Sequence, residues 1–413
     1  MLTSTKEYFL LFFGTLILIL FPSTLWLEQY FFNVKPIIYL IFTFFILLNS
    51  KNIFKFVKNI CFDNIKNLDF LIILSILIFF ISQGQLNFYA LSFLALYFFI
   101  STLYITSVDS NINLISIIIN SLVFSGLFTL MGIYFGLIES IFFDTTYFHQ
   151  YQPSGYPNPT SSIIFKLTGY SLSNHISGFQ ISMNYSAYII ISSLAVINFT
   201  SYSPKLINLI KCALIFTLIL IQSKVGLLYV AILVSLKIFS KFHKAPKLIF
   251  IFGICLGYLF LTHITILESG SEISNTKYYR ELAFSFYNLD FYLSLFSWLK
   301  LQSINYLASS NFLFSNLDEY VIYANNTDPH SLFFSCIFIG GILFSILLMI
   351  KLFSVIFNYF FNNIRKDIFF STALCALLVE SITWDSYDSP IFWLIVFFGQ
   401  YYPSIMKKIS HQK

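Results

Sequence analysis

Long apolar runs separated by shorter polar stretches fill most of the 413-residue chain. Phe, Ile and Leu dominate runs of about 20 residues, the length that an α-helix needs to cross roughly 30 Å of hydrocarbon. The short alternating strands of a membrane β-barrel are not seen in this pattern. An all-α, polytopic membrane protein is therefore expected, with about twelve spans near residues 8–27, 36–50, 69–83, 86–105, 112–138, 181–199, 206–222, 224–240, 247–267, 332–358, 368–384 and 389–405.

The division between the seventh and eighth predicted spans rests on length. About 35 largely apolar residues follow Leu206, which is too many for a single crossing. The polar triplet Gln222-Ser223-Lys224 is therefore taken as the break. The first run, 8–27, ends without a small-residue cleavage site, so we expect a retained helix instead of a signal peptide.

Composition supports this class of protein. Apolar residues make up 58% of the chain and charged residues only 10%, against roughly 25% charged in soluble domains. The net charge of +5 does not indicate a nucleic-acid partner, because the basic residues flank helices and form no single stripe. The five cysteines lie in or beside apolar runs without metal-ligand spacing, so neither a disulfide framework nor a metal site is predicted.

Lys and Arg predict the orientation of the helices. With twelve spans and the N-terminus inside, 17 of the 23 basic residues, Lys351 among them, fall on the cytoplasmic side. Such an excess supports both termini in the cytoplasm and a single polytopic membrane domain over residues 1–413. The six basic residues left outside are Lys35, Lys166, Lys224, Lys277, Arg280 and Lys300.

Two long loops face outward in this topology, at residues 140–180 and 268–331. The first contains the turn-rich segment Gln152–Pro159, typical of an ordered loop or a lid. The second ends in Thr327-Asp328-Pro329-His330-Ser331, directly before an apolar run. Proline restrains its own backbone and the residue before it, so we expect the histidine to be held at the membrane surface.

His330 is the first candidate for chemistry, because an imidazole titrates near physiological pH and can take a proton from a hydroxyl. A capping or interfacial histidine without chemistry is the alternative. Lys277 and Arg280 would share a face of a helix at this spacing. Together they suit a pyrophosphate, with a bidentate guanidinium and a point-charge ammonium. The alternative is a solvated face on which Glu281 balances Arg280.

Lys224 stands between two apolar runs. An ionisable group at or in a membrane is costly, so we take a functional role as the first hypothesis. The alternative is a side chain that extends to the outer interface without such a role. His175 lies just before the sixth predicted span and carries little signal alone. Glu139 and Glu380 lie near outer helix ends, and pairing with the outer basic residues is a hypothesis for them.

Three segments resemble motifs of the O-antigen polymerase and O-antigen ligase superfamily. The resemblance covers roughly residues 170–345, and the order of the motifs and the long outer loop before the histidine agree with the family. The matching residues are Ser177-Gly178-Phe179 with Asn184 and Ala187, then Gln222-Ser223-Lys224-Val225-Gly226-Leu227-Leu228, then His330-Ser331 separated by nine residues from Gly341.

The chain departs from the family pattern at several positions. His175 and Lys224 stand where the family usually has arginine, and Phe344 stands where it has a polar residue. The family also has an arginine shortly before a tryptophan of the long loop. Here Arg280 lies well upstream of Trp298, so the match at this position is incomplete.

The resemblance implies a GT-C-like glycosyltransferase of the bacterial inner membrane, without metal or cofactor, that uses an undecaprenyl-pyrophosphate-linked glycan on the periplasmic face. His330 would deprotonate the acceptor hydroxyl, with Asp328 and Ser331 in support. The donor pyrophosphate would be held by basic side chains that stabilise its developing charge, namely Arg280, Lys224, Lys277 and His175.

The leading hypothesis is a polymerase that joins lipid-linked repeat units into O-antigen or capsular polysaccharide. The ligase of the same superfamily, which transfers the finished glycan to lipid A-core, is the nearest alternative. A transporter or flippase of the same lipid-linked sugars is a third, although no internal repeat is evident. A chain-length regulator and a flippase would be partners of the polymerase, alongside membrane lipids.

Overall fold

A computed structural model describes residues 12–16, 19–20, 68–83, 93–94, 96–97, 100–101, 104, 114–142, 176–180, 182–221, 223–238, 252–257, 332–363, 367–381 and 389–410. Regular structure within these ranges is helical, and they contain no β-strand. The expected all-α class is therefore confirmed for the described part of the chain.

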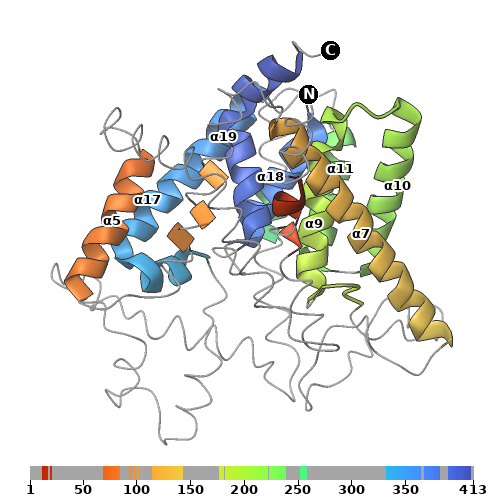
Figure 1. The fold of residues 1–413 in the computed structure, drawn as a ribbon, viewed down its shortest axis with the longest axis horizontal. Coiled ribbons are helices and arrows are strands. Elements are labelled where there is room, and N and C mark those ends of the chain that lie inside the picture. The colour runs from red at the N-terminus through yellow and green to blue at the C-terminus, as the bar shows by residue number, and fades with distance from the viewer. Residues whose placement is uncertain are drawn as a thin grey trace, which may run out of the picture.

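The described helices pack side by side in a bundle, which α7 crosses obliquely (Figure 1). In chain order they are α5 (Leu68–Gln83), α7 (Leu114–Phe142), α9 (Met183–Val196) with the 3-10 helix η2 (Ile197–Phe199), α10 (Pro204–Ile221), α11 (Lys224–Ile238), α17 (Leu332–Asn363), α18 (Ile368–Glu380) and α19 (Pro390–Ser410).

The predicted helices agree with these elements wherever the structure describes them. In particular, the break placed at Gln222-Ser223-Lys224 is confirmed, because α10 ends at Ile221 and α11 begins at Lys224. The predicted span 332–358 corresponds to α17, which continues to Asn363. The predicted span 36–50 and the outer loop 268–331 lie outside the described residues, as does most of the loop 140–180.

Two of the described helices are long and apolar enough to cross a membrane, over Ile115–Glu139 in α7 and over Pro204–Ile221 in α10. Mean hydropathy in both is 1.9, and few charges interrupt them. The described part of the chain is thus an all-α fold with two candidate membrane-spanning helices.

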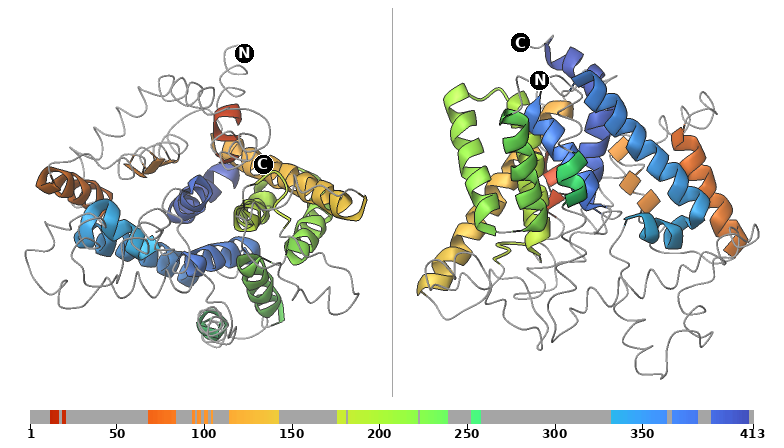
Figure 2. Two further views of the ribbon diagram at one scale, coloured as in Figure 1. Left: turned by 90° about the horizontal axis from the view of Figure 1, so that it is seen from below. Right: turned by 180° about the vertical axis from the view of Figure 1, so that it is seen from behind.

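Helix α9 lies at the centre of the bundle, where α7, α10, α11, α18 and α19 surround it (Figure 2). Every residue from Ser186 to Val196 is buried. Its sequence mixes Ile and Ala with Ser, and small side chains of this kind let neighbouring backbones approach closely. A helix that is buried on all faces and lacks a polar stripe is typical of the interior of a bundle.

Helix α7 approaches α9 closely because it carries glycine at the contacts. A Cβ atom added to Gly126 would lie 2.5 Å from the Cβ of Ser193, and one added to Gly132 would lie 2.7 Å from the backbone nitrogen of Phe179. Gly178 meets the same stretch of α7 from the other side, since its own Cβ would lie 2.8 Å from the backbone of Ile133. The turn before α9 is therefore seated directly on the α7 backbone.

The helix ends fall into two groups. Asp367, directly before α18, shares a hydrogen bond with Asn198 of η2, at the end of α9. The backbone N–H of Leu332, which begins α17, donates to the carbonyl of Ser381, directly after α18 (2.9 Å). The starts of α9, α11 and α17 therefore lie at one end of the bundle, the motif end, and the start of α18 lies at the opposite Asp367 end (Figure 1).

We predict that Gly126→Ala destabilises the protein by about 1–3 kcal/mol, because the added methyl group overpacks the contact with Ser193. Thermal unfolding of the detergent-solubilised protein, followed by tryptophan fluorescence, measures the change. The matched control is Gly253→Ala, since a Cβ at Gly253 meets nothing within 4 Å. The control should be neutral or slightly stabilising, because alanine is the better helix former. Equal effects of the two substitutions would contradict the close contact between α7 and α9.

Candidate functional site

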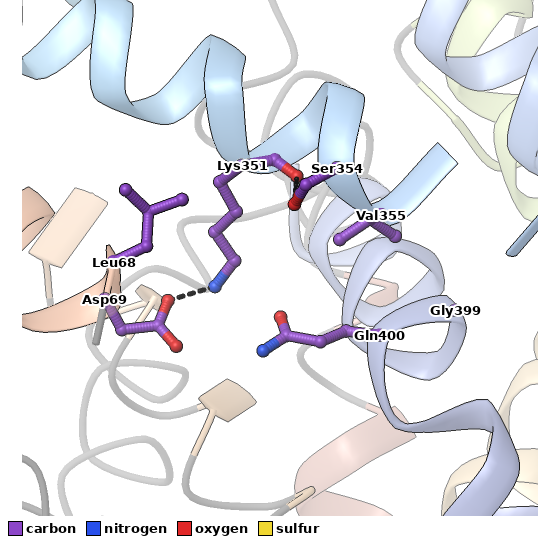
Figure 3. Close-up of a pocket in the computed structure, with 7 residues that line it drawn as sticks. All are labelled: Leu68, Asp69, Lys351, Ser354, Val355, Gly399 and Gln400. Atoms are coloured by element: carbon purple, nitrogen blue, oxygen red, sulfur yellow. Dashed lines mark hydrogen bonds and ion pairs between the residues drawn. The ribbon is translucent and has the colours of Figure 1, made fainter. Parts of the chain in front are cut away.

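A pair of opposite charges is buried between α5 and α17. Lys351 of α17 donates hydrogen bonds to Asp69 Oδ1 and to the hydroxyl of Tyr97, and this hydroxyl also donates to Asp69 Oδ1. The side chains of Lys351 and Asp69 are only 3% and 6% exposed, and they face each other in Figure 3. Ionised groups at this depth are costly unless they are paired and hydrogen-bonded, as these are.

Aromatic rings surround the ammonium group. Lys351 Nζ lies 4.8 Å from the centroid of the Tyr97 ring and 4.4 Å from that of Phe397. Trp393 and Phe397 meet the Tyr97 ring edge-on, with centroids 5.5 and 5.1 Å away. The negative faces of such rings attract a cation, so they add to the stabilisation that Asp69 provides.

A pocket of about 210 Å³ adjoins this pair between α5, α17 and α19. Its polar lining consists of Asp69, Lys351, Ser354 and Gln400, and the carboxamide of Gln400 points toward the ion pair (Figure 3). The Oε1 atom of Gln400 is buried and accepts no hydrogen bond from the residues that the structure describes. Leu68, Val355 and Gly399 also line it.

The pocket lies far from the motif end. Lys351 lies in the longer piece of α17, ten residues after the kink at Gly341. At 1.5 Å per residue this separation is roughly 15 Å along that piece. Asp69, the partner of Lys351, lies in the first turn of α5.

The buried pair revises one use made of the sequence. Lys351 was counted among the basic residues on the cytoplasmic side, whereas it is buried within α17 beside a carboxylate partner and so gives no information on orientation. Asp69 and Lys351 meet inside the bundle. The two residues are 282 positions apart, so the local pattern could not join them.

A second polar cluster lies at the Asp367 end. Asp367 caps α18 by accepting hydrogen bonds from the backbone N–H groups of Phe369 (3.1 Å) and Phe370 (3.2 Å). Lys211 of α10 donates to Asn198 and lies over the ring of Phe369. Burial raises the pKa of Asp367 to about 6, although the hydrogen bonds to Phe370, Asn198 and Phe369 and the charge of Lys211 all act to lower it.

At the motif end, the first of the three family-like segments forms the turn before α9. Gly178 has φ +63°, a left-handed conformation that favours glycine. Phe179 stacks on Phe128 of α7 with centroids 4.6 Å apart. Ser186 donates to the carbonyl of Ser177 (2.6 Å) and ties the turn to the helix that follows.

The second segment forms the start of α11. Ser223 Oγ accepts a hydrogen bond from the backbone N–H of Gly226 (3.0 Å) and so caps the helix. Lys224 is the first residue of α11 and is exposed. A helix N-terminus carries partial positive charge, and the ammonium of Lys224 adds a full charge beside it. This combination can attract an anion.

The third segment begins α17. Gly341 has φ +83° and ψ 173°, which interrupts the helix with a kink. Its neighbour Gly340 packs against α5, since a Cβ there would lie 2.9 Å from Cγ1 of Ile76. The nine residues from Leu332 to Gly340 are therefore a separate helical piece at the motif end, anchored to α18 through the hydrogen bond between Leu332 and Ser381.

No family model, curated protein or solved structure matches the chain. The three segments therefore rest on their likeness to family motifs and on the geometry just given. Two of them contain a glycine with positive φ, Gly178 and Gly341, and the third contains a capped helix start. Each of these features requires the small or capping residue that stands there.

Of the site residues proposed from the sequence, the structure describes Lys224. The others lie outside the described residues, namely His175, Lys277, Arg280, Asp328, His330 and Ser331. Two acidic residues noted near outer helix ends are described. Glu139 in the last turn of α7 and Glu380 at the end of α18 are both buried at the motif end.

Sequence reasoning missed the cluster of Asp69, Tyr97, Lys351 and Gln400. One signal was present, because Lys351 and Asp69 each lie within a predicted membrane span, where an ionisable residue is costly and usually has a partner. The sequence could not show that these two residues are partners of each other. Gln400 carried no such signal.

We predict that removing one member of the buried pair, by Asp69→Leu or Lys351→Met, destabilises the protein by about 3–5 kcal/mol, because a buried charge is left alone. The double variant Asp69→Leu/Lys351→Met should be closer to the wild type than either single variant. Thermal unfolding in detergent measures all three. Lys205→Met, at an exposed lysine of α10, is the control. Single variants as stable as this control would contradict the buried pair.

For Asp367 we predict a dependence on pH. Its pKa is raised in the folded protein to about 6, so the fold favours the protonated form. This contribution to stability is complete below about pH 4, near the pKa of an unfolded Asp, and is lost as the pH rises through about 6. Asp367→Asn keeps the capping oxygen without the charge. Its stability relative to the wild type should therefore increase between pH 4 and pH 7.

The magnitude follows from the shift of about two pKa units, which corresponds to roughly 2–3 kcal/mol. Thermal melts at several pH values measure the difference between the variant and the wild type. Asp367→Ala is the control, since it loses the cap at every pH, at a cost of about 1 kcal/mol. A difference between Asp367→Asn and the wild type that stays constant from pH 4 to pH 7 would show that the carboxyl is not desolvated.

Proposed function

We propose that this protein is a polymerase that joins undecaprenyl-pyrophosphate-linked repeat units into O-antigen or capsular polysaccharide. In this proposal the chain has about twelve spans of the GT-C kind and forms one membrane domain. It lies in the bacterial inner membrane with the motif end facing the periplasm. The Asp367 end and both termini face the cytoplasm.

One observation carries the proposal. The three family-like segments are far apart in sequence, yet they begin α9, α11 and α17 at the same end of the bundle. Gly178 and Gly341 adopt conformations that other residues rarely take. A shared site built from three helix starts needs this juxtaposition, which the alternating direction of the helices provides.

The orientation draws support from the remaining basic residues. With Lys351 removed from the count because it is buried, 16 basic residues still fall on the proposed cytoplasmic side and six on the other. Lys211 and Lys237, both beside the ring of Phe369, lie at the Asp367 end. This excess of basic residues on the proposed cytoplasmic side agrees with the positive-inside rule, by which cytoplasmic loops are rich in Lys and Arg.

In the proposed reaction, His330 takes the proton from a hydroxyl of the acceptor sugar. The hydroxyl oxygen attacks the anomeric carbon of the donor, the bond from that carbon to the pyrophosphate breaks, and undecaprenyl pyrophosphate leaves. Inversion at the anomeric carbon is expected. Asp328 and Ser331 flank and support the histidine.

The leaving pyrophosphate gains negative charge, which Arg280, Lys224, Lys277 and His175 would stabilise. Lys224 has structural support for this role, since it is exposed at the positive end of α11. The reaction needs no metal, cofactor or ATP, because the donor is already activated. A chain-length regulator and a flippase are the expected partners.

A transporter of lipid-linked oligosaccharide is a second candidate. It is favoured by the buried pair of Asp69 and Lys351 and by the interrupted helix at Gly341. Charges buried in membrane helices and broken helices are both found at transport sites. The ligase of the same superfamily shares the proposed chemistry and differs in its acceptor.

We predict that a deletion strain makes lipopolysaccharide with single repeats on the core, and that the wild-type gene restores the ladder. His330→Ala should fail to restore it at equal abundance in the membrane, because the acceptor hydroxyl keeps its proton. Lys224→Ala should give shorter or fainter ladders. Gel electrophoresis of the extracted glycans measures each outcome, with immunoblots of membranes to match the protein levels.

His263→Ala is the matched control, because His263 lies outside all three family-like segments, and it should restore the ladder. A full ladder from His330→Ala would show that His330 is not the base in the reaction. Bare core in the deletion strain would move the assignment to the ligase. Lipid-linked repeats accumulating on the cytoplasmic side of the deletion strain would favour the transporter.

A further inference from the structure

The pocket beside Asp69 and Lys351 has no part in the proposed polymerase reaction, since it lies roughly 15 Å beyond the kink at Gly341 along the longer piece of α17. It nevertheless has the features of a binding site. Two ionised side chains form one wall, and the buried Oε1 of Gln400 faces them without a hydrogen bond from the described residues. An acceptor in this position calls for a ligand that donates a hydrogen bond.

Among the described residues that line the pocket, the charges are balanced. Lys351 contributes one positive charge and Asp69 one negative charge, and they are held at the same wall. A ligand that carries only a negative charge would lie against the Asp69 carboxylate as well as the Lys351 ammonium. A zwitterion avoids this conflict, because its anionic group can face Lys351 while its cationic group faces Asp69 and Gln400.

The surroundings indicate a lipid as the source of this zwitterion. Next to Lys351 on α17, Ile350 is 51% and Phe353 is 64% exposed. On α5, Leu71 and Leu74 are exposed at a spacing that places them on one face. Both helices lie at the edge of the described part of the bundle (Figure 2). In a membrane, these apolar faces would meet acyl chains directly beside the polar pocket.

We propose that this pocket binds the headgroup of a phospholipid of the phosphatidylethanolamine class, with Lys351 on the phosphate and Asp69 and Gln400 on the primary ammonium. The proposal goes beyond the polymerase and does not depend on it. The volume of about 210 Å³ leaves room for the phosphoethanolamine group, while the acyl chains would lie along the exposed side chains of α5 and α17.

The primary ammonium is the specific part of this recognition. It can donate hydrogen bonds to Gln400 Oε1 and to the Asp69 carboxylate. The trimethylated ammonium of phosphatidylcholine has the same charge and no N–H group, so it leaves Gln400 without a partner. Phosphatidylglycerol keeps the phosphate and lacks the cation altogether. These two lipids are therefore matched probes.

Native mass spectrometry of the purified full-length protein tests the proposal, in detergent micelles that contain equal mole fractions of the three lipids. We expect the wild type to retain phosphatidylethanolamine at least fivefold more than either of the others. Gln400→Leu, which leaves the ion pair in place, should reduce this preference to near unity. So should the double variant Asp69→Leu/Lys351→Met, in which both charges are removed together.

Lys211→Met is the matched control, because Lys211 is also a helix lysine beside an aromatic ring, at the Asp367 end, and lies outside the pocket. It should keep the preference. Equal retention of the three lipids by the wild type would overturn the proposal, and so would a preference that survives in Gln400→Leu and in the double variant. Binding of soluble glycerophosphoethanolamine in place of the diacyl lipid would overturn the lipid as the source.

Discussion

Close contact of backbones at α9 is the constraint on which the rest of the bundle depends. Among lipids, apolar helices gain little by exchanging lipid contacts for protein contacts, so their association relies on dense packing. Gly126 supplies the space for Ser193, and Gly132 supplies it for the turn at Phe179. The turn that carries Gly178 is thus positioned by α7 and not by its own sequence alone. In this way the packing of the centre fixes the geometry of the motif end.

Polar groups obey a second constraint, because each buried charge in an apolar bundle needs partners. Asp69 and Lys351 are partners of each other, and the hydroxyl of Tyr97 and aromatic rings are further partners. Asp367 has its partners in backbone N–H groups and Asn198. Both clusters join helices that are distant in the chain, α5 with α17 in one case and α9 with α18 in the other. The two clusters therefore specify which helices pack together, whereas the apolar helix surfaces alone would allow other pairings.

Much of the fold could be predicted from the sequence, since helix positions depend on the length of apolar runs, which is local information. The boundary between α10 and α11 is an example, because Ser223 caps α11 at the point where one crossing length is used up. The partners of Asp69 and Gly126 could not be predicted. Each lies in contact with a residue of another helix, and a single sequence does not record such pairs. Of the candidate site, only Lys224 is described, and its exposure at a helix start fits the anion-binding role assigned to it.

Helix α17 connects the two regions of proposed function. Its longer piece is fixed to α5 by the pair of Lys351 and Asp69, and Gly340 adds a contact with Ile76 just before the kink at Gly341. Beyond the kink, the hydrogen bond from Leu332 to Ser381 fixes the short piece to α18. The chain that leads from the proposed catalytic loop thus enters a helix that is anchored on α18, while the pocket proposed to bind a lipid belongs to the part anchored on α5. The non-helical backbone of Gly341 separates the two parts, as kinks of this kind do. Gly340 lies on the motif side of the kink and packs against Ile76, so among the described residues it joins the short piece to α5 as well as to α18.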